Sequence, residues 1–157
     1  MPLRLDLIRH GDAVLAGSAG DASRTLSAAG RRDVAHLAEE YVRRKWRPAR
    51  VVVSPLLRAQ ETARILLDAL GGEITLETLD ELDPSYDGSQ LIAALRAVAT
   101  VDHVVAIGHQ PSLGHLTETL TGEEVAFPPA GMAWLEFGGA FEAGGGRLVQ
   151  RVLPPKS

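Results

Sequence analysis

Two histidines and two arginines occupy positions from which their side chains could act together on a phosphoryl group. Arg9 and His10 follow a short apolar stretch, Arg58 lies one helical turn after the Ser54-Pro55 pair, and His109 follows a second apolar run. Arginine presents a rigid fork of donors that matches a phosphate, so two arginines beside two histidines favour an anion site over a metal site. A phosphoryl group is therefore the expected ligand.

Residues and motifs that are absent from the sequence reduce the number of candidate nucleophiles for phosphoryl transfer. The sequence contains no cysteine and no GxxxxGK[ST] loop, which leaves water, a carboxylate or a histidine. A neutral imidazole attacks phosphorus well when its other nitrogen donates to a backbone carbonyl, and His10 is the candidate for this role. By contrast, His36 is predicted to lie on the surface and His103 to be structural. No metal and no cofactor are implied.

The elements that must position these residues alternate between strands and helices. Strands are predicted at residues 3–8, 51–53, 74–79, 103–108, 132–137 and 147–153, and helices at residues 31–46, 57–70 and 90–99, with a fourth helix capped by Ser112. A mobile loop at 13–23, closed by Gly30, and an acidic loop at 80–88 connect them. This alternation predicts a three-layer α/β/α sandwich with a mostly parallel central sheet, ending in a hairpin. Ligands of such sheets bind beyond the carboxyl ends of the strands, where the four side chains lie.

Length, hydrophobic content and net charge limit the number of domains and the classes of protein to which the chain can belong. The chain has 157 residues, 45% of them hydrophobic, and a net charge of −4, which predicts one domain over residues 1–157. The absence of a basic excess argues against nucleic-acid binding. No apolar run is long enough to span a membrane, so we expect a soluble, cytoplasmic protein.

Three ordered sequence blocks resemble the histidine phosphatase superfamily, also called phosphoglycerate-mutase-like. They are LIRHG at residues 7–11, VSPLLRAQETA at 53–63 and IGHQP at 107–111. Within the superfamily, RTLS at 24–27 and LDELDP at 79–84 look most like the SixA-type phosphohistidine phosphatases. The resemblance spans residues 3 to about 137 and implies a phosphoglycerate-mutase-like fold.

The resemblance also implies a role for each residue of the phosphoryl site. His10 would be the nucleophile that becomes phosphohistidine, while Arg9, Arg58 and His109 would bind the phosphoryl oxygens. The reaction would be a metal-independent, two-step displacement in which water hydrolyses the phosphoenzyme and releases inorganic phosphate.

The sequence identifies a general acid less clearly than it identifies the nucleophile and the phosphoryl-binding residues. Glu81 resembles the best-placed candidate, with Asp83 and Asp87 as further carboxyl groups in the same loop. An imidazole leaving group can be protonated at its distal nitrogen, so a phosphohistidine substrate needs less acid catalysis than an alkyl phosphate does.

Three functions remain open from the sequence. The first is removal of phosphate from phosphohistidine on a signalling or phosphocarrier protein, since only about six residues separate Leu82 from the next helix and leave little material for a lid. The second is hydrolysis of small phosphomonoesters. The third is a non-catalytic module that binds a phosphorylated ligand, although binding alone would not require His10.

Overall fold

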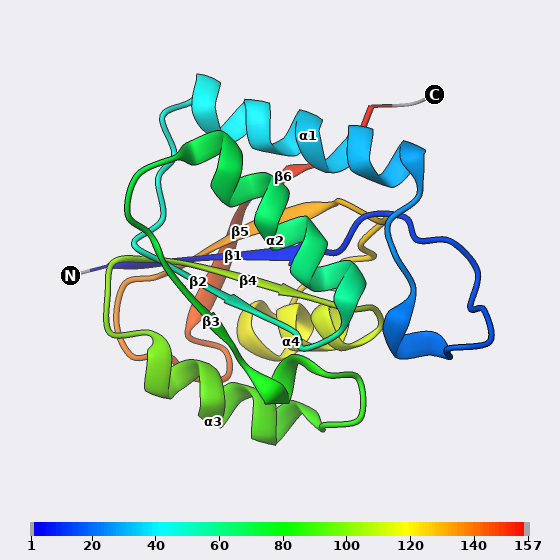
Figure 1. Cartoon of the computed structure of the whole chain (residues 1–157). Coiled ribbons are helices and arrows are strands. Elements are labelled where there is room, and N and C mark those ends of the chain that lie inside the picture. Colours follow the sequence, from blue (N-terminus) through cyan, green and yellow to red (C-terminus); the bar gives the residue numbers. More distant parts are fainter. Residues whose placement is uncertain (1, 156–157) are drawn as a thin grey trace.

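A computed structural model describes residues 2–155 and shows six strands alternating with four helices (Figure 1). The strands are β1 (Leu3–Arg9), β2 (Arg50–Val53), β3 (Thr75–Thr78), β4 (His103–Gly108), β5 (Met132–Phe137) and β6 (Gly146–Val152). The helices are α1 (Ala28–Arg43), α2 (Leu57–Leu70), α3 (Gly88–Val98) and α4 (Ser112–Thr121), with short 3-10 turns η1 (Asp21–Ser23) and η2 (Asp80–Leu82). None of the described helices is long and apolar enough to cross a membrane.

The six strands form one sheet in the order β3-β2-β4-β1-β5-β6. Strands β3, β2, β4 and β1 pair in parallel, while β5 runs antiparallel to both β1 and β6. The predicted mostly parallel sheet with a closing hairpin is therefore confirmed.

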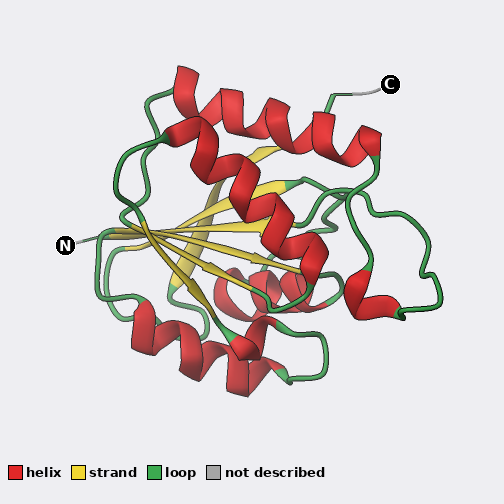
Figure 2. Ribbon diagram, in the orientation of Figure 1, coloured by secondary structure: helices red, strands yellow, loops and turns green. Residues whose placement is uncertain are grey.

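Helices cover both faces of this sheet, as Figure 2 shows, which confirms the predicted three layers. The face toward α1 and α2 buries Ile8, Val51, Val53, Val105 and Ile107 against Leu37, Tyr41, Ala59, Ala63 and Leu66. The face toward α3 and α4 buries Leu5, Leu7, Val104 and Ala106 against Leu91, Leu95, Leu113, Leu116 and Leu120. Successive residues of a strand point to opposite faces, so strands covered on both sides are apolar at nearly every position. Each large side chain buried in this way contributes about 1.5–3 kcal/mol of transfer free energy.

Helix α1 differs from its predicted bounds at both ends. It begins at Ala28 because the Ser27 hydroxyl accepts the N–H of Gly30 at 3.0 Å and caps the first turn. Gly30, predicted to close the preceding loop, therefore lies inside the helix. The helix ends at Arg43, well before Pro48, because Lys45 adopts a φ of 59°.

Two predicted irregular segments and one predicted cap also need correction. The loops at 13–23 and 80–88 each contain a 3-10 turn, η1 and η2 respectively. Ser112 is the first residue of α4 rather than its cap, and its side chain makes no capping bond. Instead, the Gln110 side-chain carbonyl accepts the N–H of Gly114 at 2.8 Å and satisfies a donor of the first turn.

A buried polar cluster lies away from the carboxyl edge and contains His103, as its structural interpretation requires. The Asp6 carboxylate is fully buried and accepts from Arg4 Nε at 2.9 Å and from the Tyr41 hydroxyl at 2.5 Å. His103 Nε2 lies 2.9 Å from the same carboxylate. A buried carboxylate is stable only with such partners, so this cluster fixes β1 against α1.

Candidate active site

The predicted phosphoryl site assembles at the carboxyl edge of the sheet because β2, β4 and β1 are neighbours in the sheet and run in parallel. Arg9 pairs with Gly108 in the β1–β4 register, so His10 and His109, the next residues, emerge side by side. Their ring centroids are 5.0 Å apart. Together with Arg9 and Arg58 they line a cavity of about 210 Å³.

His10 is held as a neutral imidazole whose Nε2 carries no proton. Its Nδ1 lies 2.7 Å from the carbonyl of Gly11, to which it donates, and Arg58 Nε donates to its Nε2 at 3.3 Å. Burial, followed by the charges of Arg58 and Arg9, lowers the pKa of His10 from 6.5 to about 4. At neutral pH Nε2 is therefore unprotonated, and its lone pair can attack phosphorus once the hydrogen bond from Arg58 is given up.

The turn after β1 requires glycine at position 11. A Cβ there would lie 2.7 Å from Val34 Cγ2 and 2.9 Å from the carbonyl of Gly30, so a larger residue would push His10 out of place. The Gly11 N–H donates to Thr62 Oγ1 at 3.1 Å, which ties this turn to α2. The RHG sequence thus has a packing reason as well as a chemical one.

Arg9 and Arg58, the two arginines predicted from the sequence, supply positive charge to the pocket. Arg9 NH1 donates to the carbonyl of Phe127 at 2.8 Å. Burial lowers the Arg9 pKa, and the negative charge of Asp12 opposes this shift. Arg58 lies in the first turn of α2, is 6% exposed, and donates to the backbone carbonyl of Asp21 at 3.0 Å. Fixed guanidinium groups in a desolvated pocket bind a phosphoryl group without reorganising during the reaction.

His109 is also buried and neutral, but its bonding differs from that of His10. Its Nε2 lies 2.7 Å from the hydroxyl of Ser54, at the end of β2. Burial, followed by the effects of His10 and Arg58, lowers the pKa of His109 from 6.5 to about 3. Within residues 2–155, its Nδ1 is buried without a hydrogen-bond partner.

Two pocket residues, Arg24 and Asp12, were not identified as site residues from the sequence. Both line the 210 Å³ cavity. Arg24 Nε donates to the carbonyl of Val14 at 2.7 Å, and its NH1 donates to the Asp21 carboxylate at 3.2 Å. Asp21 also pairs with Arg58, so the segment at 13–23 is held beside the start of α2, as Figure 1 shows for η1. The RTLS stretch pointed to family membership, but residue spacing carries no information on the path of a loop without periodicity.

The carboxyl groups after β3 occupy three different environments. Glu81 lies on η2, half-buried, and is not among the residues lining the cavity, although Pro84 of the same segment is. Asp83 is close enough for its charge to act on His109, and a hydrogen bond from the Ser85 N–H lowers the Asp83 pKa, so this group is ionised at neutral pH. Asp87 caps α3 by accepting the N–H of Gln90 at 2.9 Å.

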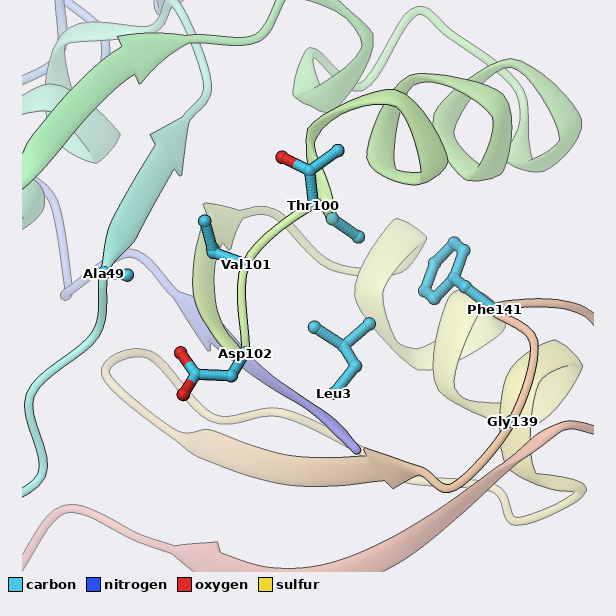
Figure 3. Close-up of a pocket in the computed structure, with 8 residues that line it drawn as sticks. Leu3, Ala49, Thr100, Val101, Asp102, Gly139 and Phe141 are labelled. Carbon is cyan, nitrogen blue, oxygen red and sulfur yellow. The ribbon is translucent and has the colours of Figure 1, made fainter. Parts of the chain in front are cut away.

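A larger cavity of about 500 Å³ lies at the opposite, amino end of the strands (Figure 3). Leu3, Val101 and Phe141 supply much of its apolar wall, and Asp102 is its one ionisable lining residue. It contains no histidine or arginine, so it offers neither a nucleophile nor an anion-binding group. Of these two cavities, only the smaller one holds the histidines and arginines that phosphoryl transfer requires.

A buried neutral histidine flanked by arginines, at the carboxyl edge of an α/β/α sheet, characterises a known class of phosphoryl-transfer proteins. Residues 5–86 match the model of the histidine phosphatase superfamily (branch 1), and the chain belongs to this superfamily.

Particular members resemble the chain over most of its length. Phosphohistidine phosphatase SixA of Escherichia coli (strain K12) is 34% identical over 129 residues, which cover 81% of this chain and 78% of that protein. The structure of the protein histidine phosphatase SixA complexed with tungstate superposes with a TM-score of 0.87 at 31% identity, covering 97% of both chains. A structure from Agrobacterium tumefaciens that bears the name SixA gives 0.85 at 25% identity, covering 98% of this chain and 99% of that one.

Proposed function

We propose that this protein is a phosphohistidine phosphatase that acts through a phosphohistidine intermediate on His10. The observation that carries the proposal is the bonding of His10: its Nδ1–H donates to the Gly11 carbonyl, so Nε2 is unprotonated, and the ring lines a cavity that contains Arg9, Arg24 and Arg58. The similarity to phosphohistidine phosphatase SixA supports the same substrate class for this chain. Residues 1–157 would form one histidine phosphatase domain.

In the first step, His10 Nε2 attacks phosphorus in line, and the P–N bond of the substrate breaks. The substrate imidazole leaves with the bonding electron pair and is neutral because its distal nitrogen already carries a proton. Arg9, Arg58 and His109 bind the phosphoryl oxygens. His10 becomes a phosphorylated imidazolium whose Nδ1–H remains bonded to the Gly11 carbonyl, 2.7 Å away, which stabilises the positive charge.

In the second step, water attacks phosphorus and the P–N bond to His10 breaks. The ring takes back the electron pair at Nε2 and is again the neutral Nδ1–H imidazole. The protons of water remain with the released inorganic phosphate. Positioning and fixed positive charge supply most of the catalysis, as in other phosphoryl transfers.

The dimensions of the site favour a phosphorylated side chain of another protein over an enclosed metabolite. The cavity of about 210 Å³ has room for a phosphoryl group and a flat imidazole, and only residues 83–87 separate η2 from α3. A signalling or phosphocarrier protein is therefore the proposed substrate. Hydrolysis of small phosphomonoesters is the second candidate, and Glu81 is its proposed general acid. The cytoplasmic location inferred from the sequence remains a prediction.

The test compares wild-type protein with His10→Ala on a phosphohistidine protein and on a panel of phosphomonoesters, with EDTA present. We expect preferential release of phosphate from phosphohistidine and complete loss of this activity in the variant. His36→Ala is the matched control, because His36 is a partly exposed histidine of α1 that does not line the cavity, and its loss should leave turnover unchanged. Full activity of His10→Ala would refute the mechanism, and faster hydrolysis of one small ester would establish the second candidate. Tight phosphate binding without turnover would indicate a binding module.

A further inference from the structure

Ser54 lies behind His109 and is fixed from several directions. Its side chain is fully buried at the end of β2, and its backbone N–H donates to the carbonyl of Ile107 at 3.0 Å. Its hydroxyl oxygen accepts the N–H of Leu56 at 3.2 Å and lies 2.7 Å from His109 Nε2. These contacts fix the position of the Ser54 hydroxyl and limit the groups with which it can form hydrogen bonds.

These contacts decide the direction of the bond to His109. A serine hydroxyl has one hydrogen to donate, and the Leu56 N–H already points at its oxygen. Within the described residues, His109 Nε2 is the acceptor that lies in reach of that hydrogen. Ser54 thus donates to Nε2, and the single proton of the neutral His109 ring must be on Nδ1.

The opposite tautomer would leave two groups in unfavourable environments. With the proton on Nε2, the buried Ser54 hydrogen would have no acceptor among the described residues. The Nδ1 lone pair of His109, a residue that lines the cavity, would also be buried without a donor, and it would repel the oxygens of a phosphoryl group bound there. With the proton on Nδ1, the buried nitrogen that has no partner in residues 2–155 becomes a donor, and a bound oxyanion supplies its acceptor.

We propose that Ser54 is a positioning residue that holds His109 as its Nδ1–H tautomer, so that this N–H donates to a phosphoryl oxygen. The two neighbouring histidines then share a protonation state but present different atoms to the ligand. His10 bonds through Nδ1 and presents the Nε2 lone pair, while His109 bonds through Nε2 and presents Nδ1–H. The catalytic part of this inference rests on the proposed phosphatase function, whereas the tautomer does not.

The tautomer is measured directly by long-range 1H–15N NMR of the imidazole rings in phosphate-free protein. We expect His109 of the wild type to carry its proton on Nδ1, and Ser54→Ala to show a mixture of tautomers. Ser54→Thr keeps the hydroxyl and should restore the wild-type pattern. A proton on His109 Nε2 in the wild type overturns the proposal, whether or not the variants fold and whether or not the protein is a phosphatase.

A pair of substitutions at His109 separates its two ring nitrogens. The amide nitrogen of asparagine occupies the position of Nδ1 relative to the backbone, and that of glutamine the position of Nε2. His109→Asn should therefore bind tungstate and inorganic phosphate more tightly than His109→Gln, and equal or reversed affinities contradict the proposal.

Turnover provides the remaining readout. Ser54→Ala should lower kcat on phosphohistidine protein roughly tenfold, with Ser54→Thr recovering most of the loss. Thermal unfolding of both variants shows whether the change reflects the fold instead. An unchanged kcat in Ser54→Ala would refute the positioning role. If the wild type had no phosphatase activity but showed the expected tautomer and tungstate affinities, the proposed function would fail while the assignment of Ser54 would stand.

Discussion

His10 should remain a competent nucleophile when the pH is lowered from 7 to 5. Its pKa is lowered from 6.5 to about 4, chiefly by burial. At pH 5 a histidine with a pKa of 4 is about 90% neutral, whereas one with a pKa of 6.5 is about 3% neutral, a difference of roughly thirtyfold in nucleophile concentration. The structure therefore predicts that the ring gains its proton far below the usual range.

The charge of Arg58 is one cause of this shift and can be removed. Arg58 Nε lies 3.3 Å from His10 Nε2, where its positive charge opposes protonation. Arg58→Gln should raise the His10 pKa part of the way toward 6.5, because burial, the larger cause, remains.

The assay is an NMR titration of the His10 ring in wild-type and Arg58→Gln protein. The kcat/KM for phosphohistidine protein, corrected for spontaneous hydrolysis, should follow the same titration in its acid limb. Proton uptake by wild-type His10 with a midpoint near 6.5 would refute the reasoning, since the ring would then be neither buried nor surrounded by positive charge in the way the structure shows.

Three further changes test other parts of the structure. As the pH falls from 6.5 to about 4, His10 should lower the free energy of unfolding by up to about 3 kcal/mol, because the unfolded state binds a proton at His10 that the folded state does not. His109, whose pKa is lowered to about 3, should add a comparable decrease. Urea unfolding at both ends of this range measures the total, and His10→Ala should show a smaller decrease. Gly30→Ala would place a Cβ 2.1 Å from the carbonyl of Asp12, so thermal unfolding should show a loss of about 1–3 kcal/mol, together with lower activity. Glu81→Gln should slow hydrolysis of an alkyl phosphate more than that of phosphohistidine, since the imidazole leaving group needs no new proton; equal slowing of both substrates would contradict this role.

Much of the fold could be predicted because strong local signals coincide with its elements. Helix α2 has the predicted bounds because Gly71 and Gly72 follow it. Strand β4 also has the predicted bounds, because an apolar, β-branched run defines it. Residues 9, 10, 58 and 109 could be expected to lie together because they follow strands of a parallel sheet.

The parts that could not be predicted depend on contacts between distant segments. Gly30 is a helix residue because Ser27 caps the helix before it, and its lack of a Cβ admits the backbone of Asp12. Arg24 reaches the pocket because Val14 and Asp21 hold its guanidinium, and no periodicity in the sequence reports such contacts. Hydrophobic spacing locates elements, but it does not define the course of a loop.

Strand order explains why Ser54 acts on His109 and not on His10. The sequence of neighbours is β2, β4, β1, with Val53 opposite Ile107 and Arg9 opposite Gly108. The residues that follow these strands therefore form a row in which His109 lies between Ser54 and His10. The Ser54 hydroxyl occupies Nε2 of His109, so Nδ1 of His109 is left for the phosphoryl group that His10 attacks. If β1 lay between β2 and β4, the Ser54 hydroxyl would instead lie beside His10 and could donate to the Nε2 that must attack phosphorus. The strand order therefore assigns the two histidines their different roles.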